Sequence, residues 1–279
     1  MFKKSPWDTN ILIVGMGEVG RPIFEIIEEN SEFSVYGYDL DRKKCSDNFL
    51  KIPNKVDILH ICIPCILMDD FIKTVTQYYE LYKTELLIIN STIPPLTTQF
   101  LAEELPRKVF IVHSPIFGTH ESKEAMKIQI KNYVHLVGGI NKESAMIAYR
   151  YFKDIGLKYI KVMRSPLESE IMKIMETTYA GWMITFFSEF HRLCEEVDAD
   201  FVEIVEALVE TYEPNCNKPI WHPDVIGGHC IMQNIDLLLQ VYDSGFLHLI
   251  KESNELRKEE VKDERIKRII DVIKRLKKP

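Results

Sequence analysis

Residues 15–20 read Gly-Met-Gly-Glu-Val-Gly, a glycine spacing that suits a phosphate-binding turn. An apolar run at residues 11–14 precedes the turn and a helical pattern follows it, which is the context in which this spacing binds a dinucleotide. The first glycine allows a tight turn, the second lets a pyrophosphate approach the backbone, and the third lets helix pack on strand. Free N–H groups at the helix start bind phosphate. We therefore expect cofactor contacts from Gly15, Met16, Gly17, Glu18, Val19 and Gly20.

An acidic residue, Asp39, ends the next strand-like run, 19 residues after Gly20. A carboxylate there hydrogen-bonds a ribose 2′-hydroxyl and repels a 2′-phosphate, so it favours NAD over NADP. Arg42, three residues after Asp39, weakens the preference for NAD over NADP. We also expect cofactor contacts from Pro64, Ser91 and Thr92. The alternative is a glycine turn that binds no ligand. It is disfavoured because the strand-like run, the helical pattern and the acidic residue all lie at the spacing of a dinucleotide-binding motif.

The second group of reactive residues is Ile-Gly-Gly-His-Cys at 226–230. Two glycines before Cys230 let other groups approach its backbone. A cysteine at a loop-to-helix junction gains thiolate character from the helix N-terminus, so Cys230 is a candidate nucleophile, with a buried structural thiol as the alternative. His222, Asp224, His229 and Cys230 match no zinc spacing, and we predict no metal. Cys62 and Cys65 enclose Pro64 among apolar residues, which favours buried thiols over redox work.

The elements that position these residues change in kind along the chain. Strand-like runs at 11–14, 33–38, 57–63, 86–90, 109–113 and 134–137 alternate with helical patterns at 20–30, 69–82 and 97–105. This alternation predicts an α/β fold, a Rossmann-type doubly wound parallel sheet. Helical patterns then follow at 168–197, 201–212, 231–242 and 247–276. We predict an NAD-binding domain at 1–162 and an all-helical substrate and dimerisation domain at 163–279.

Composition limits the class of protein. The 279 residues carry 35 Lys and Arg against 42 Asp and Glu, a net charge of −7, which disfavours general nucleic-acid or anionic-membrane binding. Six cysteines are too sparse for a disulfide framework in so long a chain. No apolar run approaches the roughly 20 residues of a membrane span, and the start lacks signal-peptide features. We expect a soluble cytoplasmic protein.

Several of these motifs occur in the order seen in the UDP-glucose/GDP-mannose dehydrogenase family. They are the glycine turn, Asp39, Ser-Thr-Ile-Pro at 91–94, Ser-Pro at 114–115, residues 168–179 and Gly-Gly-His-Cys at 227–230. The chain looks closest to the members that act as UDP-N-acetylmannosamine dehydrogenases. The resemblance implies that NAD oxidises a sugar primary alcohol twice, to a carboxylate.

The resemblance also implies roles for individual residues. Cys230 would attack the intermediate aldehyde, and water would hydrolyse the thioester that follows. Lys173 would stabilise an alkoxide or pass a proton. Thr92 would lie beside the nicotinamide, and Asn234 would contribute a hydrogen bond at the reacting centre. Substrate contacts are expected from Thr177, Gly227, Gly228 and His229.

The chain departs from the family pattern at several of these positions. Ile116 stands where the family has Glu, Thr177 where it has Asn, and Asn234, after Gln233, where it has Asp. An amide cannot act as a base, so the first oxidation should survive these changes better than the second. We also expect a short form without the family's C-terminal nucleotide-binding domain. Either a partner chain supplies that surface or the substrate is smaller.

Two other functions stay open. One is a two-electron dehydrogenase or reductase, with Lys173 as acid and base, because residues 113–118 resemble a stretch of prephenate dehydrogenases and β-hydroxyacid dehydrogenases also place a lysine on such a helix. The other is a non-catalytic NAD-binding subunit, which the altered residues suggest. The helical segment 168–197 is apolar on more than one face and predicts a homodimer built around it.

Overall fold

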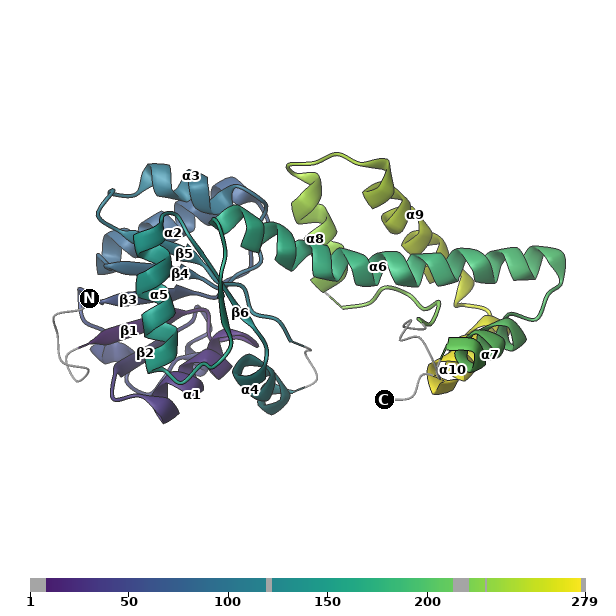
Figure 1. Cartoon of the computed structure of the whole chain (residues 1–279), viewed down its shortest axis with the longest axis horizontal. Coiled ribbons are helices and arrows are strands. Elements are labelled where there is room, and N and C mark those ends of the chain that lie inside the picture. The colour runs from purple at the N-terminus through teal and green to yellow at the C-terminus, as the bar shows by residue number, and fades with distance from the viewer. Residues whose placement is uncertain (1–8, 119–121, 213–220, 229, 277–279) are drawn as a thin grey trace. The chain divides into compact units, whose positions relative to one another are not determined.

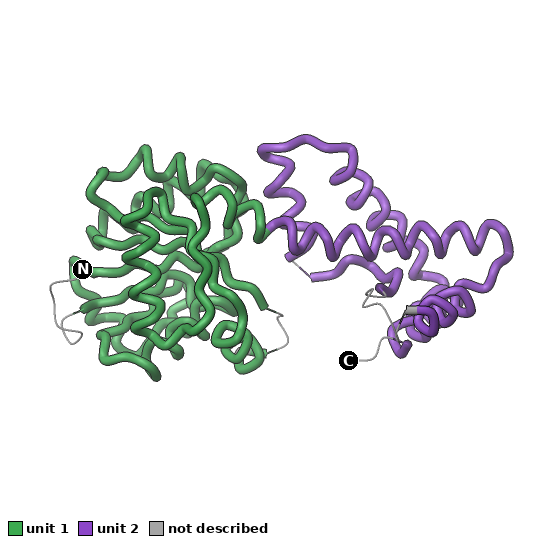
Figure 2. The backbone as a smooth tube through the Cα atoms, in the orientation of Figure 1, with its two compact units in different colours: residues 1–173 green, residues 174–279 purple. Residues whose placement is uncertain are grey.

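The computed structural model of the chain describes residues 9–118, 122–212, 221–228 and 230–276. It divides into two compact units, residues 1–173 (unit 1) and 174–279 (unit 2), which Figure 2 shows in different colours. The helix α6 (Pro166–Val197) supplies its first two turns to unit 1 and the rest to unit 2. The boundary predicted at residue 162 lies just before this helix.

Unit 1 is built on a seven-stranded sheet with the order β2-β1-β3-β4-β5-β6-β7. Its strands are β1 (Asn10–Val14), β2 (Ser34–Tyr38), β3 (Ile58–Ile61), β4 (Leu86–Ile89), β5 (Phe110–His113), β6 (His135–Gly139) and β7 (Ile160–Val162). Its helices are α1 (Gly20–Asn30), α2 (Met68–Tyr82), α3 (Thr97–Glu104), α4 (Lys123–Asn132) and α5 (Lys142–Asp154), with short 3₁₀ turns η2 (Arg42–Lys44) and η3 (Phe49–Lys51). Figure 1 labels the helices and the strands β1 to β6.

The sheet is parallel-dominated, which confirms the Rossmann-type fold predicted from the sequence. One pair departs from this pattern, because β6 runs antiparallel to β5, with Val112 opposite Gly139. The sequence patterns also left out α4, α5 and β7. In α4 charged and polar residues outnumber apolar ones, which hides the helical period, whereas the buried face of α5, with Ala145, Ala148, Tyr151 and Phe152, does have helical spacing.

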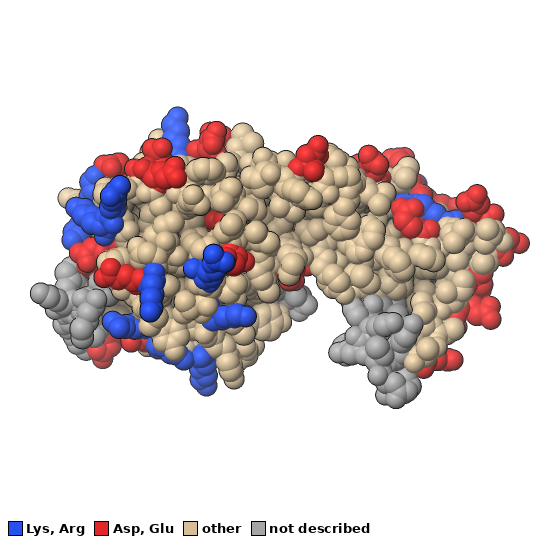
Figure 3. Space-filling model, turned by 45° about the horizontal axis from the view of Figure 1, so that its top comes forward, with Lys and Arg blue, Asp and Glu red and all other residues tan. Residues whose placement is uncertain are grey.

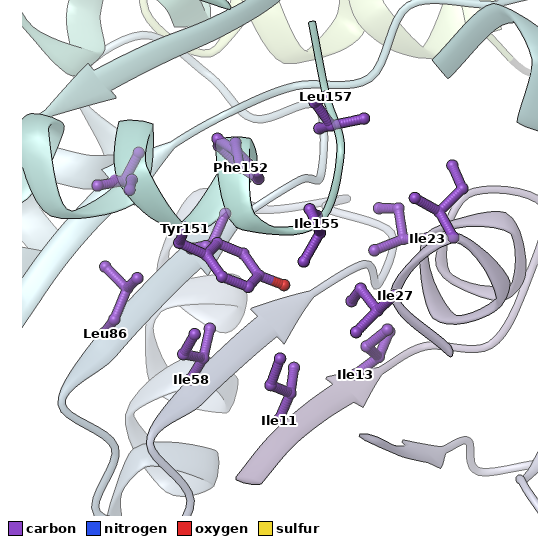
Figure 4. Packing of buried hydrophobic residues seen from close by; sticks show 14 of the residues in the cluster. Ile11, Ile13, Ile23, Ile27, Ile58, Leu86, Tyr151, Phe152, Ile155 and Leu157 are labelled. Carbon is purple, nitrogen blue, oxygen red and sulfur yellow. The ribbon is translucent and has the colours of Figure 1, made fainter. Parts of the chain in front are cut away.

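The strands β1, β3, β4 and β5 form because they are short, mostly apolar runs that are buried on both faces. Ile11 and Ile13 point to one face, where Ile23 and Ile27 of α1 and Tyr151 of α5 cover them (Figure 4). The alternate residues of the strands point to the other face and are also fully buried. The sheet is therefore a rigid layer that fixes the positions of the strand ends.

The chain reverses direction across the sheet at β1, which lies between β2 and β3. In open α/β sheets a ligand binds beyond the carboxyl ends of the strands at such a reversal. The glycine turn follows β1 and Asp39 follows β2. The topology thus brings the predicted cofactor residues to one edge of the sheet.

Unit 2 is helical, as predicted, with α7 (Phe201–Tyr212), α8 (Cys230–Leu239), α9 (Gly245–Glu260) and α10 (Glu264–Leu276) beside α6. Apolar residues from these helices and from the loop before α8 form its buried clusters. The predicted segment 247–276 is two helices, because the Asp263 side chain accepts a hydrogen bond from the backbone N–H of Arg265 at 2.8 Å and starts α10.

Charged side chains of both signs lie on the surface of the described residues (Figure 3). In the view of Figure 3, Lys and Arg side chains gather mostly over unit 1 and are interspersed with acidic ones. Within the described ranges, no helix combines the length and the apolar character needed to cross a bilayer.

Candidate active site

The glycine turn after β1 has the geometry that a dinucleotide turn requires. Gly15 adopts φ +92°, and a Cβ there would lie 2.5 Å from the carbonyl oxygen of Cys62. A Cβ at Gly20 would lie 1.8 Å from the carbonyl oxygen of Gly15. A Cβ at Gly17 would meet no atom within 4 Å. The chain therefore needs glycine at positions 15 and 20 for its own fold, whereas Gly17 faces space that a ligand can fill.

Asp39 is fixed against this turn by its own hydrogen bonds. Its Oδ2 accepts from the backbone N–H of Met16 at 2.8 Å, and its Oδ1 accepts from that of Asp41 at 2.9 Å. The half-buried carboxylate keeps free lone pairs, so it can accept further hydrogen bonds from a ribose. Arg42 lies exposed in η2, and Arg21 donates from Nη2 to the carbonyl oxygen of Lys44 at 2.5 Å.

The ends of β3 and β4 place the other predicted cofactor residues. Pro64 is exposed after β3. The buried Ser91 hydroxyl donates to the carbonyl oxygen of Ile63 at 2.6 Å, which joins the loops that follow these two strands. Thr92 is half-buried beside it. Gly15–Gly20, Asp39, Pro64, Ser91 and Thr92 thus all follow the carboxyl ends of β1 to β4.

Lys173 lies at the end of the part of α6 that belongs to unit 1. Its Nζ is 4.8 Å from the centroid of the Phe117 ring, a cation–π geometry. Burial lowers the pKa of the neighbouring His113 to about 3, and the charge of Lys173 adds to this effect. Ile116, which stands where the family has an acid, is buried in the core of unit 1.

Cys230 is the first residue of α8 and is half-buried. The N–H groups of a first helical turn favour a thiolate there. Gly228 before it adopts φ +73°, and a Cβ at Gly228 would meet no atom within 4 Å. Asn254 of α9 holds this loop, since its Oδ1 accepts from the N–H of Ile226 at 2.8 Å. Gly227 is exposed, and His229 lies outside the described residues.

Asn234 and Thr177 are partners in unit 2. Both are buried, and Asn234 Nδ2 donates to Thr177 Oγ1 at 3.0 Å, while Thr177 Oγ1 donates to the carbonyl oxygen of Ile174 at 2.9 Å. Asn234 lies one turn after Cys230 on α8, and Thr177 one turn after Lys173 on α6. Two positions at which the resemblance led us to expect a departure therefore bond to each other.

The Cys62 and Cys65 pair does not offer a reactive thiol. Burial raises the pKa of the Cys65 thiol to about 12 and that of the Cys62 thiol further still, so neither is a reactive thiolate. Among the residues that the structure describes, no three His, Cys, Asp or Glu side chains gather as metal ligands. His229, one of the four residues considered for a metal, is outside that set.

Two buried residues around Thr92 were not identified from the sequence as site residues, Glu170 and His113. Glu170 hydrogen-bonds the backbone before α3, and His113 hydrogen-bonds the backbone of Ser91. Glu170 precedes Lys173 by one helical turn, which is the only signal that the sequence offers for it. His113 was noted as part of a motif but without a role.

Comparisons with known proteins point to one group of enzymes. Residues 167–256 match the sequence model of the central domain of the UDP-glucose/GDP-mannose dehydrogenase family. The UDP-N-acetyl-D-mannosamine dehydrogenase of Methanococcus vannielii is 28% identical in an alignment 285 positions long that covers 88% of this chain. The match covers 64% of that relative, so the chain spans slightly less than two thirds of its length.

Solved structures share the fold. A UDP-N-acetylmannosamine dehydrogenase of Pyrococcus horikoshii superposes with a TM-score of 0.75 at 20% identity, covering 91% of this chain and 70% of that one. The 3-hydroxyisobutyrate dehydrogenase of Mycobacterium tuberculosis superposes with a TM-score of 0.65 at 14% identity, covering 96% and 99%. At these identities the two likenesses establish a Rossmann-type domain followed by helices.

Proposed function

Because the chain is related to the UDP-glucose/GDP-mannose dehydrogenase family through residues 167–256, we propose that it is an NAD-dependent dehydrogenase of a nucleotide sugar. It oxidises the sugar primary alcohol through a covalent intermediate on Cys230. The observation that carries the proposal is the position of Cys230, the first residue of a helix, after a loop whose Gly228 has no atom within 4 Å of a Cβ position. The substrate class follows from the relatives, which are named as UDP-N-acetyl-D-mannosamine dehydrogenases.

The residues after β1 and β2 fit the cofactor. The space at Gly17 admits a pyrophosphate to the backbone, and the N–H groups at the start of α1 bind it. The carboxylate of Asp39, oriented by the N–H of Met16, accepts from the ribose hydroxyls. Ser91, Thr92 and Pro64 line the strand ends beyond. When bound, NAD supplies the acceptor for the hydride that leaves the sugar carbon in each oxidation.

The chain's own residues carry out the remaining steps. The Lys173 ammonium stabilises the oxyanion that forms when the alcohol loses its proton. Loss of a hydride from the alkoxide carbon gives the aldehyde. The Cys230 thiolate then adds to the aldehyde carbon, and the carbonyl oxygen becomes a second oxyanion. Loss of a hydride from this adduct leaves a thioester on Cys230. Water hydrolyses the thioester, which releases the carboxylate and returns the thiol.

The neutral side chains of this chain bear on the last step. The Asn234 amide can orient a water or substrate group but cannot take its proton, and Thr177 already occupies one of its donors. Ile116 is buried in the core and offers no polar group. We therefore propose that thioester hydrolysis is slower than the two oxidations.

The experiment counts NADH formed per sugar consumed and identifies the product. The purified chain is given NAD and UDP-N-acetylmannosamine, and Cys230→Ala is compared with Cys194→Ala, a matched change at a buried thiol in the core of unit 2. We expect two NADH per sugar in the parent and in Cys194→Ala, and no carboxylate from Cys230→Ala. Undiminished carboxylate from Cys230→Ala would overturn the covalent step.

A second candidate function is a two-electron dehydrogenase that uses Lys173 as acid and base. The neutral hydrogen bond between Asn234 and Thr177 favours it, because no carboxylate supports a hydrolytic step there. It predicts one NADH per product and full activity in Cys230→Ala. NAD binding without turnover on nucleotide sugars or small hydroxy acids would instead identify a non-catalytic subunit.

We also propose that the chain is a homodimer through α6. Six exposed apolar residues recur at intervals of three, four or seven positions along this helix and form one stripe, Met175, Tyr179, Phe186, Phe190, Leu193 and Val197. A second copy of the same helix covers such a stripe symmetrically. Light scattering at micromolar concentration should give a dimer for the parent chain and a monomer for Phe190→Glu.

A further inference from the structure

The segment that carries Thr92 is held at both ends by two adjacent residues of α6. Residues 91–96 lie in the connection between β4 and α3, within unit 1. Glu170 hydrogen-bonds the backbone where this segment enters α3. Ser169 reaches the start of the segment through His113. We call these three residues, Ser169, Glu170 and His113, the clamp.

Glu170 binds the end of the segment with both carboxylate oxygens. Oε2 accepts from the N–H of Leu96 at 2.7 Å and Oε1 from the N–H of Thr98 at 2.9 Å. These are unsatisfied donors at the start of α3, where a negative charge is favourable. Leu96 adopts φ +76°, a left-handed conformation that a non-glycine residue keeps only when its surroundings impose it. Glu170, which is 1% exposed, supplies part of that constraint.

His113 binds the beginning of the segment. Its Nε2 lies 3.2 Å from the carbonyl oxygen of Ser91, which can only accept, so Nε2 carries the proton. Its Nδ1 lies 2.8 Å from the Ser169 hydroxyl, which is also 2.8 Å from the carbonyl oxygen of Pro166. His113 and Ser169 are both fully buried, and burial keeps His113 neutral by lowering its pKa. The ring therefore links α6 to the peptide that precedes Thr92.

We propose that Glu170 is a positioning residue, which with Ser169 and His113 fixes the backbone that carries Thr92 to the helical turn that carries Lys173. Glu170 and Lys173 lie three residues apart, on one side of α6. A shift of residues 91–96 relative to α6 would change where Thr92 and Lys173 meet the substrate and the nicotinamide. The clamp thus serves the dehydrogenase reaction, and in this it rests on the proposed function.

A carboxylate is needed at position 170 because two N–H groups face it. Glutamine has the same shape but offers one acceptor oxygen, and its NH₂ would face the second N–H. Glu168 is a matched control on the same turn of α6. Its Oε2 accepts from the Ser165 hydroxyl at 2.5 Å, a local bond that does not reach residues 91–98.

The test compares Glu170→Gln with Glu168→Gln in the full chain, by steady-state kinetics and by amide hydrogen exchange of residues 91–104. We expect Glu170→Gln to lower kcat by about tenfold, with KM for NAD changed less than about twofold, and to speed exchange at Leu96 and Thr98. Glu168→Gln should match the parent in both. Ser169→Ala, which keeps the carboxylate, should give a smaller fall in kcat and serves if Glu170→Gln does not fold.

The possible results distinguish the clamp, its positioning role and the proposed function. Unchanged exchange at Leu96 and Thr98 in Glu170→Gln would overturn the clamp. Faster exchange with an unchanged kcat would overturn its positioning role. A parent chain that binds NAD but turns over no substrate would refute the proposed function, while the exchange measurement would still judge the clamp. An equal loss of kcat in Glu168→Gln would show that any change in this turn suffices, which also contradicts the proposal.

Discussion

The three glycines of the turn after β1 have different physical reasons to be glycine. At positions 15 and 20 a side chain would collide with the carbonyl oxygens of Cys62 and Gly15. At position 17 the neighbourhood is open and the backbone lies outside the left-handed region. Sequence reasoning assigned these three roles from spacing, and the geometry separates the two that serve the fold from the one that is free for a ligand.

We predict that Gly17→Ala separates stability from cofactor binding. Alanine fits this backbone, and a Gly→Ala change of this kind stabilises a protein by about 0.4–1 kcal/mol through the unfolded state. The added methyl group occupies the space that the pyrophosphate would use, so the Kd for NAD should rise about tenfold or more. Thermal unfolding and calorimetric titration with NAD measure the two effects.

The matched control for that change is Gly245→Ala, at a glycine in unit 2 that also has no neighbour within 4 Å of a Cβ. It should leave the Kd for NAD unchanged. Equal NAD affinity of Gly17→Ala and the parent would show that the cofactor does not approach the turn at this residue.

Among the helices, the hydrogen bond between Thr177 of α6 and Asn234 of α8 connects two elements that carry proposed catalytic residues. We predict that Thr177→Val costs about 1–3 kcal/mol, because it leaves the buried Asn234 amide without this acceptor. The double change Thr177→Val with Asn234→Leu should cost less than the sum of the singles. Urea unfolding of the four proteins gives the coupling energy.

The adjacent Thr178 is the control for that cycle. It is as buried as Thr177, at 8% exposed, and its hydroxyl has no hydrogen-bond partner among the described residues. Thr178→Val should therefore be neutral or slightly stabilising. A cost equal to that of Thr177→Val would mean that loss of packing, and not the hydrogen bond, explains both changes.

The sequence predicted elements well where one period dominates. The strands β1 to β5 are short apolar runs, and α6 is a long apolar helix, so pattern alone located them. The pattern is weak in α4, where charged and polar residues outnumber apolar ones, and in β7, with two of its three residues exposed, whereas α5 has an apolar face of helical period that the sequence reasoning missed. The same limit applies to the site. Motif spacing indicated Gly17, Asp39 and Cys230, but the role of Glu170 depends on two N–H groups about 70 residues away.

For the molecule as a whole, buried histidines couple stability to pH. His60 and His113 of unit 1 are fully buried, and burial lowers the pKa of His60 to about 4 and that of His113 to about 3. Burial keeps the His60 ring neutral, so Tyr151 donates to its Nε2 at 2.8 Å, while its Nδ1 donates to Asn90 Oδ1 at 2.7 Å. The unfolded chain binds protons at these rings near pH 6.5, and the folded chain does not.

The sign of the effect follows from that difference. Above pH 6.5 neither state is protonated at these rings, so their contribution to stability is fully present. Below it the unfolded state gains protons that the folded state excludes, and the free energy of unfolding falls. Between pH 7.5 and 5.5 each ring should cost about 1.4 kcal/mol. Burial also raises the pKa of Glu170. The folded chain therefore binds a proton at this carboxylate more readily than the unfolded chain, which opposes the effect of the histidines, mainly at lower pH.

We predict that unfolding at pH 5.5 takes up about one proton for each of the two rings, measured by calorimetry in buffers of different ionisation enthalpy. His60→Gln provides the control, because glutamine still offers a donor to Asn90 and an acceptor to Tyr151 without a titrating ring. It should reduce the uptake by about one proton and flatten the dependence of stability on pH. Proton uptake equal to that of the parent would show that His60 is already protonated in the folded chain, and the network would then have to be drawn with an imidazolium donating to both of its partners.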